Sequence, residues 1–442
     1  MQVEKSKTSM MEKIFYGLGN AGGQCVWTFA GSFLTLYYTD SVLVSACFIG
    51  TMMLLARLAD GISDILFGIL IEKTNTKWGK ARPWYILSII PLLISLFLAF
   101  YVPSGLTTNQ MYVYIVVTYL LLTVVFYTIY NLGYWAMLPR ISTDPDDRNI
   151  VSTVSSICGL LTGLVLAVVT APFLTAMGGT TVQSAWTAVT VAFCVVGFVL
   201  LGLCAVFVKE KIPSDVQENT DIEKVSTKDG ILSLLKCKYF YIALTIFTVG
   251  TLGSSVFMAA APYYCKDVLG NPNYYSILAL SYVLPMVLGL TMMPKFFTKY
   301  GKRKTMIVGG LIAIGGYAIT FIDTTSIAFV AGGIAISSLA RSSYMCAQWT
   351  FAADIVDYIE RRIGIRVEGM ASATNSFGAK VGTGVGSAIL GWALEFGGYS
   401  ALKSVQSPST IFAEIFVMIG VPLIGIIINC IMATQWKIEE EN

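Results

Sequence analysis

The amino-acid sequence predicts an all-α polytopic membrane protein with twelve transmembrane helices in two six-helix halves. First, its 442 residues are 55% apolar and only 12% charged, whereas soluble domains carry about 25% charged residues. Second, apolar runs long enough to cross a bilayer recur along the whole chain. Third, the longest polar stretch, residues 209–238, separates six apolar runs from six others.

The twelve apolar segments follow one another with short connections. We expect helices near residues 14–38, 43–71, 84–102, 110–138, 149–175, 184–208, 239–264, 274–295, 305–322, 326–356, 368–396 and 409–435. This divides the chain into an N-terminal six-helix bundle over 1–208, a cytoplasmic middle loop over 209–238, and a C-terminal six-helix bundle with a cytoplasmic tail over 239–442. The first segment has full spanning length and no small-residue cleavage site, which indicates a retained helix rather than a signal peptide.

The distribution of positive charge predicts the orientation of these segments. Of the 29 Lys and Arg residues, 24 lie in the tails and in the connections after even-numbered segments. Because positive residues concentrate on the cytoplasmic side, we expect both termini and the middle loop in the cytoplasm, in a multi-pass protein of the cell (inner) membrane. The net charge of +3 is too small to indicate nucleic-acid binding.

Residue types that are missing or isolated exclude several kinds of chemistry. The chain has no histidine, which excludes histidine acid–base catalysis, histidine metal ligation and a histidine proton relay. Its nine cysteines form no CxxC pair and lie mostly inside apolar runs, so we expect them to pack as small side chains. We expect no cofactor.

Two basic loops at equivalent places indicate an internal repeat. The loop after segment 2 reads EKTNTKWGKARPW, and the loop after segment 8 reads KFFTKYGKRKTM. Gly79 and Gly301 occupy matching positions, each after an aromatic residue and before a lysine. Parallel repeats of this kind are the major facilitator arrangement, in which the substrate site lies near the midplane between the halves. The alternative is that the loops carry only a topology signal.

Segment 2 contains charges that a lipid-facing helix would not carry. Arg57, Asp60 and Asp64 are spaced i, i+3, i+7, and Ser63 lies beside Asp64. Helical periodicity places them on one face, which must face a cavity or other helices. The oxygens suit a small cation, with Na⁺ possible at Asp60 and Asp64; alternatively, one carboxylate carries a proton. The remaining alternative is a buried salt-bridge cluster around Arg57.

Segment 11, which reads NSFGAKVGTGVGSAILGW, contains one isolated lysine. Gly378, Gly382 and Gly386 recur every four residues and predict a face for close helix packing. Packing does not explain Lys380, and snorkelling from a mid-helix position would be strained. Arg57 and Lys380 balance the two aspartates of segment 2, so binding of Na⁺ or H⁺ would shift this balance and release Lys380 to a substrate.

Segment 4 ends in a stretch suited to sugar recognition. Thr128, Asn131 and Trp135 are spaced i, i+3, i+7, with Tyr127 and Tyr134 adjacent. Amide and hydroxyl groups hydrogen-bond polyols, and indole rings stack on sugar rings. The alternative for Trp135 is an aromatic belt at the membrane interface.

Charged clusters after segments 4 and 10 are candidates for gating. They comprise Arg140, Arg148, Asp144, Asp146 and Asp147 in the first half, and Asp354, Asp357, Arg361, Arg362 and Arg366 in the second. We interpret them as cytoplasmic ion pairs that hold one gating state closed. The alternative is solvated loop charge, since exposed pairs contribute little.

With these residues identified, the chain resembles the glycoside–pentoside–hexuronide:cation symporters, the group of the melibiose and glucuronide carriers. The similarity is spread over YYTD (37–40), DGISD (60–64), NTKWGKARPW (75–84), ADIVDY (353–358), GIRVEG (364–369) and the segment around Lys380. The resemblance implies cotransport of a glycoside with Na⁺, Li⁺ or H⁺ by alternating access. It also implies a monovalent cation, a glycoside and the lipid bilayer as partners.

The resemblance implies roles for individual residues. Asp60, Ser63, Asp64 and Thr128 correspond to the cation site. Asn131, Trp135, Asn375, Ser376 and Lys380 correspond to the substrate site, where the lysine serves both sites. From the residues themselves we add Gln24 and Tyr127 to the substrate site, and we assign coupling and gating to Arg57, Lys380, Asp354, Asp357 and Arg366.

The chain also departs from the melibiose carrier. Galactoside carriers have acids where this chain has Gln24 and Asn131, and the melibiose carrier has Asn where this chain has Ser63. A glucuronide, pentoside or related sugar therefore fits better than melibiose, and the choice between Na⁺ and H⁺ stays open.

Two other functional classes remain from the sequence. A membrane-embedded enzyme is disfavoured because there is no histidine and no convincing nucleophile with its base. A transport-inactive sugar sensor with the same fold would be expected to lose the acids of its cation site, and both acids are present.

Overall fold

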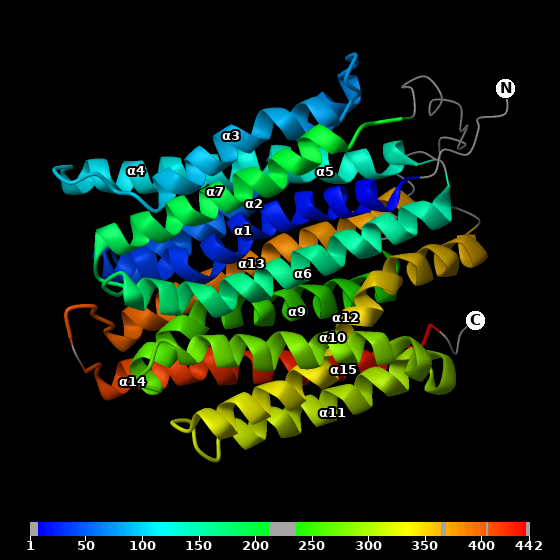
Figure 1. Cartoon of the computed structure of the whole chain (residues 1–442). Helices are drawn as coiled ribbons and strands as arrows, with labels where there is room; N and C mark the ends of the chain where they lie inside the picture. Colours follow the sequence, from blue (N-terminus) through cyan, green and yellow to red (C-terminus); the bar gives the residue numbers. More distant parts are fainter. Residues whose placement is uncertain (1–7, 143, 212–235, 364–367, 404, 439–442) are drawn as a thin grey trace. The chain divides into compact units, whose positions relative to one another are not determined.

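The computed structural model describes residues 8–142, 144–211, 236–363, 368–403 and 405–438. The helices before the middle loop are α1 (Met10–Asp40), α2 (Ala46–Lys73), α3 (Arg82–Ala99), α4 (Thr108–Leu120), η1 (Leu121–Phe126), α5 (Tyr127–Ile141), α6 (Pro145–Ala176) and α7 (Gln183–Phe207). Those after it are α9 (Lys238–Tyr263), η3 (Tyr264–Val268), α10 (Tyr274–Tyr300), α11 (Lys302–Thr320), α12 (Ile327–Ile363), α13 (Glu368–Gly397), α14 (Pro408–Ile415), η4 (Phe416–Gly420) and α15 (Val421–Gln435) (Figure 1).

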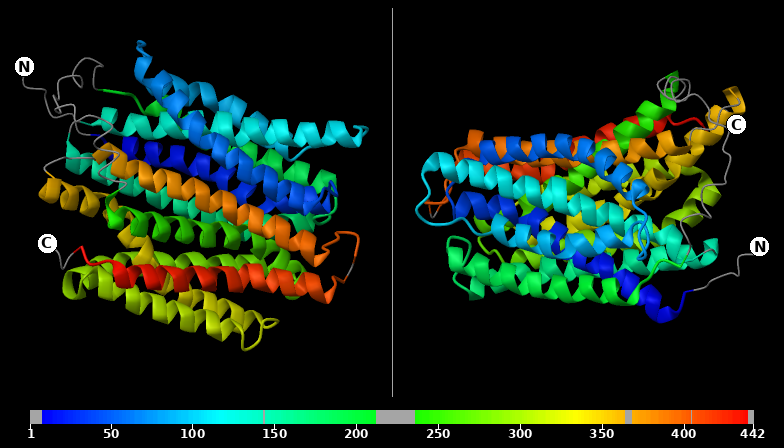
Figure 2. Two further views of the ribbon diagram at one scale, coloured as in Figure 1. Left: turned by 180° about the vertical axis from the view of Figure 1, so that it is seen from behind. Right: turned by 90° about the horizontal axis from the view of Figure 1, so that it is seen from above.

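Each predicted apolar segment coincides with one helix or with one continuous helical run in the described residues. For example, η4 joins α14 to α15 without a break, so that the three form one rod in Figure 2. Eight of these runs are long and apolar enough to cross a membrane. The other four, α1, α2, α11 and α13, are 19 to 31 residues long, and their sequences carry more charged residues, polar residues or glycines. The fold class is confirmed as an all-α membrane protein.

Contacts divide the chain into two compact units. The first comprises Met1–Val44 and Leu55–Thr220, and the second comprises Ser45–Leu54 and Asp221–Asn442. The start of α2 belongs to the second unit because it packs on α13: the Ser45 hydroxyl donates to Glu395 Oε2 at 2.8 Å, and the indole of Trp392 donates to Thr51 Oγ1 at 3.0 Å. The predicted division at 209–238 stays a prediction, since residues 212–235 lie outside the described residues.

Tyrosines fix α5 against α1 in the first unit. Tyr16 and Tyr134 stack with ring centroids 4.4 Å apart, and each hydroxyl donates to the backbone carbonyl of the other residue. Tyr130 donates to the carbonyl of Gly19 at 2.8 Å. At Gly23 a Cβ would lie 2.1 Å from the Tyr130 hydroxyl, so only glycine allows this approach. These contacts set the register of α5, which carries the candidate sugar residues.

The glycines predicted to form a packing face in segment 11 do so against α9 of the same unit. A Cβ at Gly382 would lie 2.4 Å from the carbonyl oxygen of Thr248, and one at Gly378 would lie 3.1 Å from the Thr248 hydroxyl. A Cβ at Gly386 would lie 3.1 Å from the carbonyl oxygen of Leu252. The prediction of close helix packing here is confirmed.

The two matching loop glycines both adopt backbone conformations that favour glycine. Gly79 has φ +109° and Gly301 has φ +78°. A Cβ at Gly79 would meet Glu210, whose carboxylate accepts the backbone N–H groups of Lys80, Ala81 and Arg82 at 2.7–3.0 Å. An acidic side chain therefore caps the start of α3, where the helix dipole favours negative charge.

Candidate functional site

Asp60 is the centre of a buried polar cluster in the first unit. It is only 7% exposed, in the middle of α2. The Thr128 hydroxyl of α5 donates to Asp60 Oδ1 at 2.7 Å, and the Ser63 hydroxyl donates to the Asp60 carbonyl at 2.9 Å. Arg57 Nη1 lies 3.8 Å from Asp60 Oδ2. We call Arg57, Asp60, Ser63 and Thr128 the Asp60 cluster.

An aromatic pair holds the arginine of this cluster. The Arg57 guanidinium lies 4.5 Å from the centre of the Trp27 ring on α1, a cation–π arrangement. The Trp27 ring in turn stacks on Tyr127 of α5 at 5.0 Å. Since the Arg57–Asp60 distance is long for a direct hydrogen bond, Trp27 shares the stabilisation of this charge. The Asp60 cluster is thus more than a single tight salt bridge.

A π-helical turn precedes the residue that bonds Asp60. The segment η1 covers Leu121–Phe126, and Thr128 follows it within one turn. A π turn inserts an extra residue into the helical register and occurs frequently at functional sites. Sequence periodicity predicted a helix through this region and missed the π turn.

The donor set of the Asp60 cluster fits a small monovalent cation. It offers one carboxylate and two hydroxyl oxygens, and Asp64 follows one helical turn later, half-buried. Hard oxygen ligands suit ions such as Na⁺. Within the described residues, no group of three or more His, Cys, Asp or Glu side chains could hold a metal ion.

The candidate sugar-binding residues of the first unit lie on α1 and α5. Gln24, Tyr127 and Asn131 are half-buried, and Trp135 is 39% exposed. The rings of Trp135 and Tyr134 lie nearly perpendicular to each other, with centroids 5.3 Å apart. On α13, Lys380 is half-buried. The side chains of Asn375 and Ser376 lie outside the described set.

The charged gating candidates have partners that the sequence did not predict. Lys302 Nζ donates to both carboxylate oxygens of Asp354, at 2.7 and 2.5 Å, whereas the sequence predicted Arg361, Arg362 and Arg366 as partners. Asp357 is exposed, and Arg366 lies outside the described residues. Asp354 lies beyond the apolar part of α12, Ile327–Gln348. Burial raises the pKa of its carboxyl above the usual value, and the pair with Lys302 only partly offsets this.

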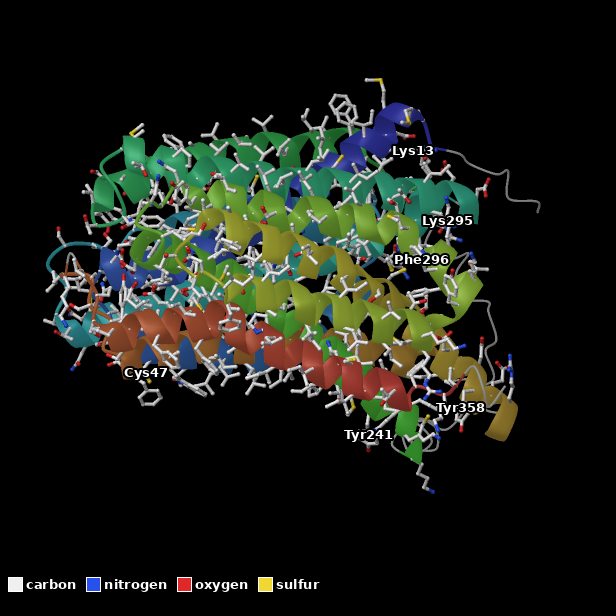
Figure 3. The ribbon with its side chains drawn as sticks, turned by 90° about the horizontal axis from the view of Figure 1, so that it is seen from below. Lys13, Cys47, Tyr241, Lys295, Phe296 and Tyr358 are labelled. Carbon is white, nitrogen blue, oxygen red and sulfur yellow. The ribbon has the colours of Figure 1, made fainter. Side chains whose placement is uncertain are left out.

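The corresponding acid of the first unit also has a lysine partner. Lys13 Nζ lies 2.6 Å from Asp147 Oδ1, and Figure 3 labels Lys13 near the start of α1. The backbone N–H and the hydroxyl of Thr8 both donate to Asp147 Oδ2, at 2.9 and 2.7 Å. The sequence predicted Arg140 and Arg148 as partners of Asp147. It did not predict Lys13, which is 134 residues away in sequence.

Sequence reasoning missed two further residues with a place in polar sites, Trp27 and Arg341. Nothing in the local pattern marks Trp27, because its partner Arg57 lies on another helix. Arg341 did carry a signal: it is a lone charge inside an apolar run, which by itself indicates a functional position.

Comparisons with known proteins agree with this architecture. A model of the MFS/sugar transport protein family matches residues 15–440. The inner membrane symporter YicJ of Escherichia coli is 29% identical over 97% of this chain and 92% of its own. The isoprimeverose transporter of Lactiplantibacillus pentosus is 27% identical over 99% and 91%. The crystal structure of the nucleoside transporter NupG matches 95% of this chain and 98% of its own with a TM-score of 0.65 at 17% identity, which shows the fold alone.

Proposed function

Because the chain belongs to the MFS/sugar transport protein family, we propose that it is a secondary active transporter that imports a glycoside with Na⁺ or H⁺ by alternating access. The relatives confirm the resemblance to the glycoside–pentoside–hexuronide:cation symporters and the expectation of a transporter rather than an enzyme. The sensor alternative gains no support from them. We place the protein in the cell (inner) membrane with both termini in the cytoplasm.

The observation that carries the proposal is the Asp60 cluster. A carboxylate this deeply buried in a transmembrane segment has a high energetic cost, roughly 2.5–3.5 kcal/mol on insertion scales. The Thr128 hydroxyl donates to this carboxylate, the Ser63 hydroxyl donates to the Asp60 backbone carbonyl, and Arg57 lies 3.8 Å away. An exchangeable Na⁺ or proton at Asp60 and Asp64, with oxygens from Ser63 and Thr128, accounts for this arrangement.

The sugar contacts follow from exposure and chemistry. Trp135 presents an indole ring for stacking, while Asn131, Tyr127 and Gln24 present groups that hydrogen-bond hydroxyls. We assign Asn375, Ser376 and Lys380 to the same substrate on the strength of the resemblance. The name of one relative, the isoprimeverose transporter, supports a glycoside as the substrate.

Coupling follows from charge balance. When a cation binds at Asp60, the negative charge that holds the neighbouring positive groups falls, and Lys380 becomes available to the substrate. Asp354, Asp357 and Arg366, together with Arg57, belong to the charged contacts that bias one gating state. A ligand shifts the equilibrium between two gating states only by its differential affinity for them. The cation and the sugar therefore each favour the gating state that binds both ligands.

The test is thermal stabilisation of the purified protein by a glycoside panel, with and without Na⁺ and at two pH values. A ligand that binds only the folded state raises its stability by mass action. We expect a glycoside whose effect requires Na⁺ or acid pH, and we expect Asp60→Asn to lose that requirement. If Asp60→Asn keeps a fully cation-dependent effect and active uptake in vesicles, the assignment of the cation site is wrong.

A further inference from the structure

The second unit contains a mostly apolar cavity with a few polar groups in its wall, and the proposed function does not use it. Its volume is about 140 Å³. The lining comes from α9, α10, α12 and α15, and includes Gly250, Ser254, Arg341, Tyr344, Gln348 and Asn429. On this measure a water molecule needs about 10–15 Å³, so the cavity has room for about ten water molecules or for a ligand group of similar size.

Arg341 brings a full positive charge to this cavity inside the membrane-spanning part of α12. Its Nη2 donates to the carbonyl of Gly250 at 3.3 Å and reaches the hydroxyl of Ser254 at 3.5 Å. Its Nη1 donates to the Tyr317 hydroxyl at 3.3 Å, and the guanidinium lies 5.7 Å from the centre of the Tyr282 ring. All four partners are neutral, and across the described ranges no carboxylate lies within ion-pair distance of Arg341.

A second group in the cavity also lacks a partner. Asn429 of α15 is 2% exposed, and its side-chain oxygen has no hydrogen-bond partner among the described residues. A buried polar atom without a hydrogen-bond partner destabilises the fold. Gln348, on the same wall, donates to the carbonyl of Ile246 at 3.1 Å and is 7% exposed. The cavity therefore combines an uncompensated cation with an unsatisfied amide.

Glycines on α9 let two polar side chains of the cavity approach the helix closely. A Cβ at Gly250 would lie 2.5 Å from the amide nitrogen of Gln348, and one at Gly253 would lie 3.3 Å from Arg341 Nη2. Gln348 and Arg341 therefore pack directly against these two positions.

We propose that this cavity is an anion subsite in which Arg341 binds the carboxylate of an acidic glycoside, a hexuronide, with Asn429 contributing a hydrogen bond to a hydroxyl of the same ligand. The proposal rests on the proposed function, because it takes the ligand to be the transported sugar. A guanidinium presents its N–H donors in a planar fork that matches a carboxylate. A neutral glycoside would leave the charge of Arg341 uncompensated.

The experiment compares two ligands that differ only at one carbon, methyl glucuronide and methyl glucoside, by thermal stabilisation of the purified full-length protein with the coupling ion present. We expect wild-type protein to bind the glucuronide at least about 10-fold more tightly, since a hydrogen bond to a charged group contributes about 1.5–3 kcal/mol. Arg341→Gln should remove this preference and leave the affinity for the glucoside. Lys403→Gln, a matched loss of one exposed lysine in the same unit, should keep the preference.

Several outcomes would overturn the inference. One is equal affinity of the wild-type protein for both ligands; another is an Arg341→Gln variant that keeps the preference. A third is an acetate effect that matches the glucuronide effect, because the site would then bind any free carboxylate. If Arg341→Gln does not fold, Arg341→Lys, which keeps the charge without the planar fork, must reduce the preference.

The two proposals fail in different ways. If the glucoside binds with a requirement for the coupling ion and the glucuronide has no advantage, only the anion subsite is wrong. If neither glycoside binds with such a requirement, the proposed function is wrong as well.

Discussion

The hydrogen bond from Thr128 to Asp60 gives the sharpest test of the cation site. Thr128 is 3% exposed, and its hydroxyl lies 2.7 Å from Asp60 Oδ1. Thr128→Val removes this hydroxyl and keeps the shape of the side chain. Thr123→Val is the matched control, because Thr123 is 6% exposed on the neighbouring turn and its hydroxyl donates to the carbonyl of Tyr119 at 3.0 Å instead.

The structure sets the expected magnitude of the Thr128→Val effect. A hydrogen bond to a charged group contributes about 1.5–3 kcal/mol, which corresponds to about 10- to 100-fold in affinity. If the coupling ion is Na⁺, the variant loses an oxygen ligand, and half-maximal uptake needs about 10- to 100-fold more Na⁺. If the coupling ion is H⁺, the carboxylate loses a donor that stabilises its charge, and uptake persists to a pH at least about one unit higher. The direction of the shift therefore identifies the ion.

The assay is uptake of a radiolabelled glycoside into membrane vesicles, measured against Na⁺ concentration and against pH, with expression of each variant quantified. We expect Thr123→Val to stay within about threefold of the wild type, because it does not touch Asp60. The reasoning is refuted if Thr128→Val and Thr123→Val show the same cation dependence. It is also refuted if Thr128→Val lowers sugar affinity at saturating cation and leaves the cation dependence unchanged.

Three further predictions concern stability, each measured by thermal unfolding in detergent. Gly382→Ala should destabilise strongly, since its Cβ would lie 2.4 Å from a backbone oxygen, whereas Gly315→Ala, with nothing within 4 Å, should be neutral or stabilising; equal effects would contradict the packing account. Asp147→Asn should cost about 3 kcal/mol by breaking a buried ion pair, and an unchanged melting temperature would contradict it. The pKa of Asp354 is raised, so the folded chain holds the Asp354 proton more tightly than the unfolded chain does. The contribution of Asp354 to stability is therefore lost as the pH rises above about 4 through the raised pKa. Asp354→Asn should flatten this pH dependence of stability, and a pH profile identical to that of the wild type would contradict the assignment.

Hydropathy and helical periodicity predicted the helices but not all the partners of their polar residues. The burial of Asp60 followed from the cost of a charge in lipid, and the glycine face of α13 followed from a repeat of four residues. The π turn at Leu121–Phe126 did not follow, because no local pattern distinguishes it from α-helix. Lys13 and Lys302 were missed as ion-pair partners because a pairing distant in sequence depends on tertiary packing.

Arg341 also changes the charge balance that coupling must satisfy. Arg57 and Lys380 with Asp60 and Asp64 form a neutral set, and Arg341 raises the sum to +1. A hexuronide carboxylate returns it to zero. If one coupling ion moves with one hexuronide, the translocated charge is zero, whereas a neutral glycoside with one ion carries +1.

Membrane potential distinguishes these two cases, because moving one charge across 100 mV corresponds to about 2.3 kcal/mol. Imposing a potassium diffusion potential of about 100 mV, negative inside, should therefore leave glucuronide accumulation in vesicles unchanged when the Na⁺ and pH gradients are held fixed. Glucoside accumulation under the same conditions should rise by up to about 50-fold. A potential-driven rise for the glucuronide equal to that for the glucoside would mean that a second cation moves with each glucuronide, and the one-to-one stoichiometry would then be wrong.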